Sequence, residues 1–147
     1  MRQFTVTTDI AAPPERVWDV MSDIDRWNEW TPGVTSVTRL GGGPFAVGTR
    51  VLVRQPKLPP AFWTITEIIS GRSFSWVSVA PGLRAIGVHS VEPAPDGSRA
   101  TLALDLQGLL GGLWGRVSKG ITERYIGYEA RGLKARSENP QFRHSGM

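Results

Sequence analysis

Apolar and polar residues alternate over residues 2–10, where apolar residues such as Phe4 and Ile10 share one side. This period of two is typical of a half-buried strand. The stretch AAPPER ends the alternation, and its paired prolines suit the first turn of a helix, where a missing N–H costs nothing. Apolar residues then recur at helical spacing up to Ile24. A second short helix is expected over residues 23–30, because a Pro-Gly pair follows it.

Residues 34–107 change to short apolar runs separated by clusters of turn-forming residues. The expected strands are residues 34–40, 48–54, 61–69, 73–80, 84–92 and 99–107. Glycine and proline occupy the clusters between them, and Asp96-Gly97 is a strong hairpin signal. Because no helical pattern interrupts these strands, they predict an antiparallel sheet.

A long amphipathic helix is expected over residues 109–134. Seven of its apolar residues fall within an arc of roughly 120° on a helical wheel. These residues are Leu110, Leu113, Trp114, Val117, Ile121, Tyr125 and Tyr128. Gly111, Gly112 and Gly115 each cost about 1 kcal/mol relative to alanine, so the N-terminal end of this helix should be loose or bent.

The order of the elements predicts one α+β domain over residues 1–136, followed by a disordered tail over residues 137–147. Two short helices separate the first strand from the second, and the long helix comes last. A helix is only about 10 Å across, so it cannot cover a strongly curved sheet of seven antiparallel strands completely. The expected consequence is a gap between sheet and helix, lined with apolar side chains.

Two stretches in this order carry a family resemblance: TDIAAPPERVWDVMSDIDRWNEWTPGVTSV and GVHSVEPAPDGSRATLALDLQGLLGGL. Over about residues 2–135 the chain resembles the polyketide cyclase/dehydrase-like branch of the START/Bet v 1 (SRPBCC) superfamily. The resemblance implies a helix-grip fold, in which a curved antiparallel sheet wraps around the C-terminal helix. It also implies a cavity for a lipid, a polyketide or another hydrophobic ligand. It implies no single activity, because members include aromatase/cyclases, lipid carriers and hormone receptors.

The composition excludes several kinds of site and partner. The 147 residues contain no cysteine, so disulfides, thiolate metal sites and cysteine nucleophiles are excluded, and a cytoplasmic location is expected. No apolar run approaches the ~20 residues of a membrane span, so no integral membrane segment is expected. The N-terminal stretch lacks the pattern of a signal or transit peptide.

The net charge of +4 arises entirely in residues 108–147, which hold seven basic and three acidic residues. The acidic residues are interspersed among the basic ones, and no aromatic RNA-reading motif accompanies them. A solvated helix face and tail explain this segment, so no nucleic-acid partner is expected. The sequence does not indicate an oligomeric state.

Few residues could support catalysis. The glycine-rich stretch LGGGPFAVG lacks the Lys-Ser/Thr of a phosphate-binding loop, and no nucleophile elbow is present. Weak candidates for a general base are His89, Tyr125 and Asp105, and an ordinary structural role stays open for each. The alternation around His89 does not decide which face of its strand points inward. A metal site needs three or four ligands within reach, so neither a metal nor another cofactor is expected.

The candidate ligand-binding residues are apolar or aromatic residues on the strands, the short helices and the long helix. They are Trp27, Trp30, Trp63, Ile65, Phe74, Trp76, Ser78, Leu102, Leu104, Leu110, Trp114, Val117, Ile121 and Tyr125. The resemblance places Trp27 and Trp30 on the short helices that close one end of the sheet. Plain packing of a filled core explains the same residues and stays open as the alternative.

Two functional hypotheses follow. In the first, the protein binds a hydrophobic small molecule (a lipid, a polyketide or an isoprenoid-like compound) as a carrier or sensor. In the alternative, it is a polyketide cyclase or aromatase that acts on a poly-β-ketone in the same cavity. The tyrosine hydroxyls on the apolar stripe favour a cavity, because small-molecule sites combine apolar walls with a few polar groups.

Overall fold

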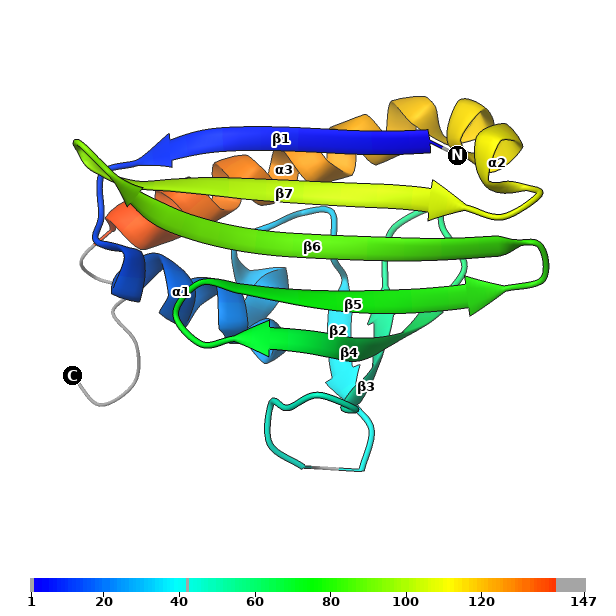
Figure 1. Ribbon diagram of the computed structural model, residues 1–147, viewed down its shortest axis with the longest axis horizontal. Coiled ribbons are helices and arrows are strands. Elements are labelled where there is room, and N and C mark those ends of the chain that lie inside the picture. Colours follow the sequence, from blue (N-terminus) through cyan, green and yellow to red (C-terminus); the bar gives the residue numbers. More distant parts are fainter. Residues whose placement is uncertain (1, 42, 140–147) are drawn as a thin grey trace.

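A computed structural model describes residues 2–41 and 43–139 and shows one curved sheet with helices on one of its faces (Figure 1). The strands are β1 (Arg2–Ile10), β2 (Ser36–Arg39), β3 (Arg50–Arg54), β4 (Ala61–Ile69), β5 (Ser73–Ala80), β6 (Leu83–Ala94) and β7 (Gly97–Gln107). The helices are α1 (Pro14–Ser22), the 3-10 helix η1 (Ile24–Glu29), α2 (Gly111–Val117) and α3 (Lys119–Glu138).

The seven strands follow the order β1-β7-β6-β5-β4-β3-β2, and every neighbouring pair is antiparallel. The predicted helix-grip architecture is therefore confirmed. Strands β2 to β7 form a meander of hairpins. The last strand, β7, also pairs with the first, β1, and places Leu104 opposite Phe4. The first and second strands of the chain are thus the two edges of the sheet.

The short helices between β1 and β2 form as the sequence predicts. Pro14 is the first residue of α1, and Val17, Val20 and Met21 turn its apolar side into the core. The next segment is a 3-10 helix, which has three residues per turn. Ile24 and Trp27 are three residues apart, and both are buried.

The predicted single helix over residues 109–134 is wrong in one respect, because it is divided at Ser118 into α2 and α3. A Cβ on Gly111 would lie 2.8 Å from the carbonyl oxygen of Leu106. Glycine thus lets α2 pack directly on the end of β7. The expectation that glycines would loosen or bend this end identified the right place.

The C-terminal helix also continues further than predicted, to Glu138. Its last turn is anchored, because Glu138 accepts a hydrogen bond of 2.8 Å from the backbone N–H of Ala11 and one of 2.7 Å from Lys134. Both bonds lower the pKa of Glu138, and the bond from Ala11 has the larger effect. Residues 140–147, the rest of the tail predicted to be disordered, lie outside the described residues.

The buried side chains form two clusters on the face of the sheet that carries the helices. The first lies under α1 and η1 and includes Trp27, Phe74 and Trp76. The second joins α3 to β1, β6 and β7 through Phe4, Ala85, Leu102, Leu106, Ile126 and Ala130. Trp63 of β4 packs against both clusters. The candidate site lies where they meet.

Candidate functional site

The structure decides which face of β6 points inward. Ala85, Gly87, His89 and Val91 are buried, while the residues between them are only half-buried. His89 therefore lies on the face of the sheet that the helices cover, and only 5% of its surface is exposed. One of the three candidate bases is thus in the interior, on the side where the sequence predicts a ligand.

Aromatic side chains enclose the His89 imidazole. The ring of Phe74 stacks on it at 4.4 Å between centroids and 10° between planes. The rings of Trp27 and Trp76 approach it edgewise at 5.1 Å and 5.4 Å. Trp63 continues this cluster through Trp76, at 5.4 Å. Four of the predicted ligand-binding residues therefore gather around or beside one imidazole.

Glu129 of helix α3 is the polar partner of His89. Its Oε1 atom lies 3.1 Å from Nε2 of His89, so this bond joins the helix to the middle of the sheet. The other ring nitrogen, Nδ1, is buried and has no hydrogen-bond partner among the described residues. A carboxylate that orients an imidazole, with the second nitrogen unused, is an arrangement that can bind a polar group or move a proton.

Sequence reasoning missed Glu129, although one signal could have found it. Glu129 follows Tyr125 by four residues, and residues four apart share a helix face. Since Tyr125 was placed on the inward stripe, Glu129 belonged there as well. Glu129 was instead counted among the charged residues of a solvated helix face, because of its charge.

Tyr125 has a structural role in this state of the molecule. Its hydroxyl donates a short hydrogen bond to the carbonyl oxygen of Pro56 in the loop between β3 and β4. Its ring lies against Gly33, where an added Cβ would lie 3.3 Å from the Tyr125 side chain. Tyr125 therefore links α3 to the loop between β3 and β4, and its side chain fills the space between helix and loop at this point.

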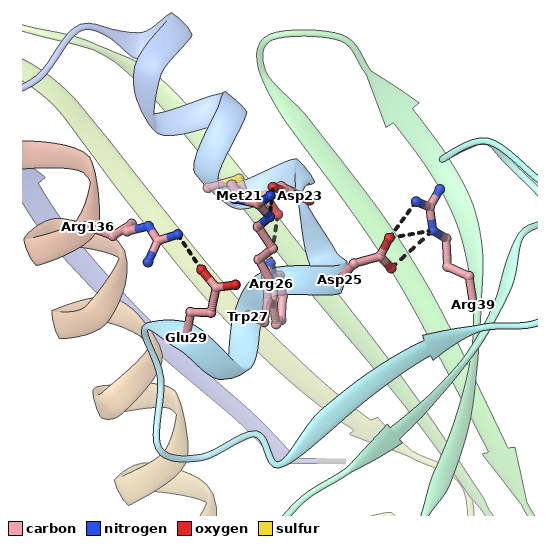
Figure 2. Close-up of polar contacts among 8 residues, drawn as sticks. All are labelled: Met21, Asp23, Asp25, Arg26, Trp27, Glu29, Arg39 and Arg136. Carbon is pink, nitrogen blue, oxygen red and sulfur yellow. Dashed lines mark hydrogen bonds and ion pairs between the residues drawn. The ribbon is translucent and has the colours of Figure 1, made fainter. Parts of the chain in front are cut away.

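Helix η1 is held on both sides by ion pairs, which Figure 2 shows. Asp25 binds Arg39 of β2 at 2.6 Å, and Glu29 binds Arg136 of α3 at 2.6 Å. The hydrogen bonds and charge of Asp25 raise the pKa of Arg39. Trp27 points from η1 into the core, and its indole N–H donates to the carbonyl oxygen of Met21 at 3.0 Å. These contacts fix Trp27 as a wall of the His89 cluster.

The predicted ligand-binding residues on the sheet, next to η1 and in α3 differ in burial. Ile65, Phe74 and Leu102 are almost fully buried, whereas Trp63 and Leu104 on the same covered face are only partly buried. Trp30, Ser78 and Ile121 are also partly buried. Trp63 and Leu104 therefore keep part of their surface accessible, although they lie on the inward face of the sheet.

Helix α2 does not bring its part of the predicted stripe into the interior. Leu110, Trp114 and Val117 are 48%, 43% and 72% exposed. The wheel that placed them inward assumed a continuous helix, and the break at Ser118 removes that continuity. The buried side of α3 consists of Ile126, Ala130, Leu133 and Ser137. Thus α2 lies outside the cluster around His89.

Asp105 also lies apart from His89. Its neighbours Leu104 and Leu106 point toward the helices, so Asp105 points to the opposite face of the sheet. There its Oδ2 atom accepts a hydrogen bond of 2.9 Å from Gln107, and Oδ1 is buried without a partner among the described residues. Of the three candidate bases, only His89 and Tyr125 share the covered side.

Residues 2–41 and 43–139 contain no group of three or more His, Cys, Asp or Glu side chains that could hold a metal ion. No helix within these ranges is long and apolar enough to cross a membrane.

Solved structures share this fold. The major latex-like protein 151 of Panax ginseng superposes with a TM-score of 0.76 at 14% sequence identity, over 95% of this chain and 98% of that one. A protein of Thermus thermophilus superposes with a TM-score of 0.73 at 20% identity, over 92% of this chain and 97% of that one. At these identities the likeness shows the fold alone.

Sequence comparison gives the family. An uncharacterized protein of Mycobacterium tuberculosis is 36% identical over 105 residues, which are 67% of this chain and 61% of that protein. The chain thus matches less than two thirds of the length of this curated relative. A family model described as "Polyketide cyclase / dehydrase and lipid transport" matches residues 1–138. The chain therefore belongs to this family, on the helix-grip fold that its sheet and C-terminal helix form.

Proposed function

We propose that this protein binds a hydrophobic small molecule between helix α3 and the covered face of the sheet, as a carrier or sensor. The family and the fold suggest a hydrophobic ligand. The observation that carries the proposal is the partial burial of Trp63, which packs against both buried clusters, and of Leu104, which packs against the second. In a filled core, apolar side chains at such positions would be fully enclosed.

The chemistry of the surroundings indicates the class of ligand. The walls are aromatic or aliphatic, and the polar groups are few: His89 with Glu129 and the hydroxyl of Ser78, since the Tyr125 hydroxyl donates to Pro56. Such a site stabilises a ligand mainly through the apolar area it removes from water, at about 25 cal/mol per Å². A lipid, a polyketide or an isoprenoid-like compound has the required apolar area, and the polar groups orient it.

A space-filling substitution tests the proposal. We expect Leu104→Phe to lower the affinity for a fluorescent apolar probe, such as a naphthalene sulfonate dye, by about tenfold, and to leave stability nearly unchanged. The larger side chain would occupy the space that the probe needs. Ile86→Phe, a half-buried position on the opposite face, is the matched control and should leave probe binding unchanged.

The opposite result is equally clear. If the wild type binds no apolar probe and Leu104→Phe costs about 1–3 kcal/mol, as overpacking of a filled core does, then the region is core and the proposal fails. If the wild type does bind the probe, mass spectrometry of small molecules extracted from the purified protein identifies the ligand.

The cyclase alternative has one observation in its favour, the imidazole oriented by Glu129. Aldol condensation of a poly-β-ketone needs a base that removes a proton next to a carbonyl group, and a histidine held by a carboxylate can serve as one. Incubation with a short poly-β-ketone, followed by chromatography, separates the two functions. A carrier returns the compound unchanged, whereas a cyclase returns a cyclised product in amounts that exceed the protein.

A further inference from the structure

Nδ1 of His89 is enclosed by protein yet has no hydrogen-bond partner within the described residues. Buried polar atoms nearly always have a partner, so an exception calls for an explanation. The other side of the same ring is fully engaged, because Nε2 lies 3.1 Å from Glu129. The ring is therefore held in place with one nitrogen free to act.

Glu129 determines the chemical character of that free nitrogen. An ionised carboxylate only accepts hydrogen bonds, so Nε2 must carry the proton and donate it. When the imidazole is neutral, Nδ1 then carries a lone pair and is an acceptor. The unused position on His89 is consequently matched to a donor, such as a hydroxyl group.

A donor of the protein lies beside this acceptor. Trp76 pairs with Gly87 across β5 and β6, and a Cβ on Gly87 would lie 2.7 Å from the indole nitrogen of Trp76 and 3.7 Å from Cε1 of His89. The missing side chain of Gly87 thus lets the indole N–H and the imidazole border the same point of the sheet. On the other side Gly87 pairs with the partly buried Leu104.

We propose that His89 and Trp76 bind the hydroxyl group of an apolar aromatic ligand, that is, a phenol or a naphthol-like alcohol. This inference rests on the proposed function and names the chemistry of its ligand. The hydroxyl donates to Nδ1 of His89 and accepts from the indole N–H of Trp76. The partly buried side chains of Leu104 and of Trp63, whose ring lies 5.4 Å from that of Trp76, provide apolar surfaces for the aromatic body.

The ligand reaches Nδ1 from the side of Trp63 and Leu104, where burial is incomplete, and its hydroxyl lies between Nδ1 of His89 and the indole N–H of Trp76. An ether of the same shape lacks the proton and leaves Nδ1 unpartnered. A site built to bond a hydroxyl discriminates strongly against an analogue that lacks it, because its own buried group then stays unsatisfied.

The test compares 2-naphthol with 2-methoxynaphthalene and naphthalene by isothermal titration calorimetry of the full chain. We expect the wild type to bind 2-naphthol about five- to tenfold more tightly than either analogue, the factor that one net hydrogen bond supplies. In the free protein, nitrogen NMR of His89 at a pH where the ring is neutral should show the proton on Nε2.

Glu129→Gln tests the orientation of the ring without removing the contact. The amide of glutamine can donate a hydrogen bond to Nε2, and the ring proton can then move to Nδ1. With this proton Nδ1 is a donor, so it no longer accepts a hydrogen bond from the hydroxyl group of 2-naphthol. It can instead donate to the ether oxygen of 2-methoxynaphthalene. We expect the preference for 2-naphthol to disappear in this variant. Glu123→Gln, an equal change of charge at an exposed position of α3, should keep the preference.

Each outcome has one meaning. Equal affinity of the wild type for all three compounds overturns the hydroxyl site and leaves the apolar ligand site standing. A proton on Nδ1 in the wild type also overturns it. If no compound binds and the apolar dye does not bind either, the proposed function fails together with this inference.

Discussion

Two glycines of helix α3 illustrate how much a single position can decide. A Cβ on Gly132 would collide with the backbone carbonyl oxygen of Trp30, so the helix can approach the end of η1 only because this residue has no side chain. A Cβ on Gly120 would meet nothing within 4 Å. The first glycine is therefore required by packing, whereas the second only lowers helix propensity.

We expect Gly132→Ala to lower the free energy of unfolding by roughly 2 kcal/mol or more, because the neighbouring atom is backbone and cannot move aside. Gly120→Ala, the matched control, should raise it by about 0.5–1 kcal/mol, since alanine is the better helix former. Urea denaturation followed by circular dichroism measures both. Equal effects of the two changes would show that α3 does not pack closely on η1.

At the scale of elements, local periodicity predicts what local contacts stabilise. The strands at residues 61–69 and 73–80 were predicted with the bounds that the structure has, because alternation and glycine turns act within a few residues. The glycines predicted a bend at the N-terminal end of the last helix, but the division into two helices at Ser118 was not predicted. The inward face of β6 could not be chosen either, because both of its faces carry small or apolar residues.

The exposure of helix α2 gives a prediction at this scale. Trp114 is 43% exposed, so Trp114→Ala should cost about 1 kcal/mol or less. Trp27 is 2% exposed, and Trp27→Ala should cost about 3–5 kcal/mol, as deletion of a large core side chain does. Guanidinium denaturation compares the two. A severe loss for Trp114→Ala would contradict the exposed position of α2.

At the scale of the whole molecule, contacts between distant segments hold the site together. His89 and Glu129 are 40 positions apart, and Glu29 and Arg136 are 107 apart. No short-range pattern relates such residues, which explains why the sequence predicted the imidazole but not its carboxylate. Apolar residues of the site were found more easily, because alternation indicates the buried side of a strand that has only one apolar face.

Glu138 joins the two ends of the fold, and this contact should depend on pH. Its pKa is lowered from the ordinary 4.5 by the hydrogen bond from Ala11 and by that from Lys134. A group whose pKa is lower in the folded state stabilises the fold above its unfolded pKa, and this contribution is lost as the pH falls through the folded value. Glu138→Gln should therefore be less stable than the wild type at about pH 7.

The difference should disappear once the pH is well below the ordinary pKa of a carboxyl group, where the wild-type side chain is also neutral. Thermal unfolding of both proteins between about pH 3 and pH 7 measures it. Glu123→Gln removes the same charge from an exposed position of the same helix, and should follow the wild type throughout. A constant gap between wild type and Glu138→Gln would contradict the contact.

The pairing of β1 with β7 limits the order in which the sheet can form during synthesis. Thr7 and Thr101 face each other across these strands although 94 positions separate them. Strand β1 is made before the other six strands of this sheet, and it has no β7 to pair with until those strands have followed, whereas β4 to β7 can pair in turn as successive hairpins. Because α3 packs on β1 as well, the sheet edge and the helix can be joined only after α3 has been made. Until then β1 has unpaired backbone groups, with which a strand of a second nascent chain can pair.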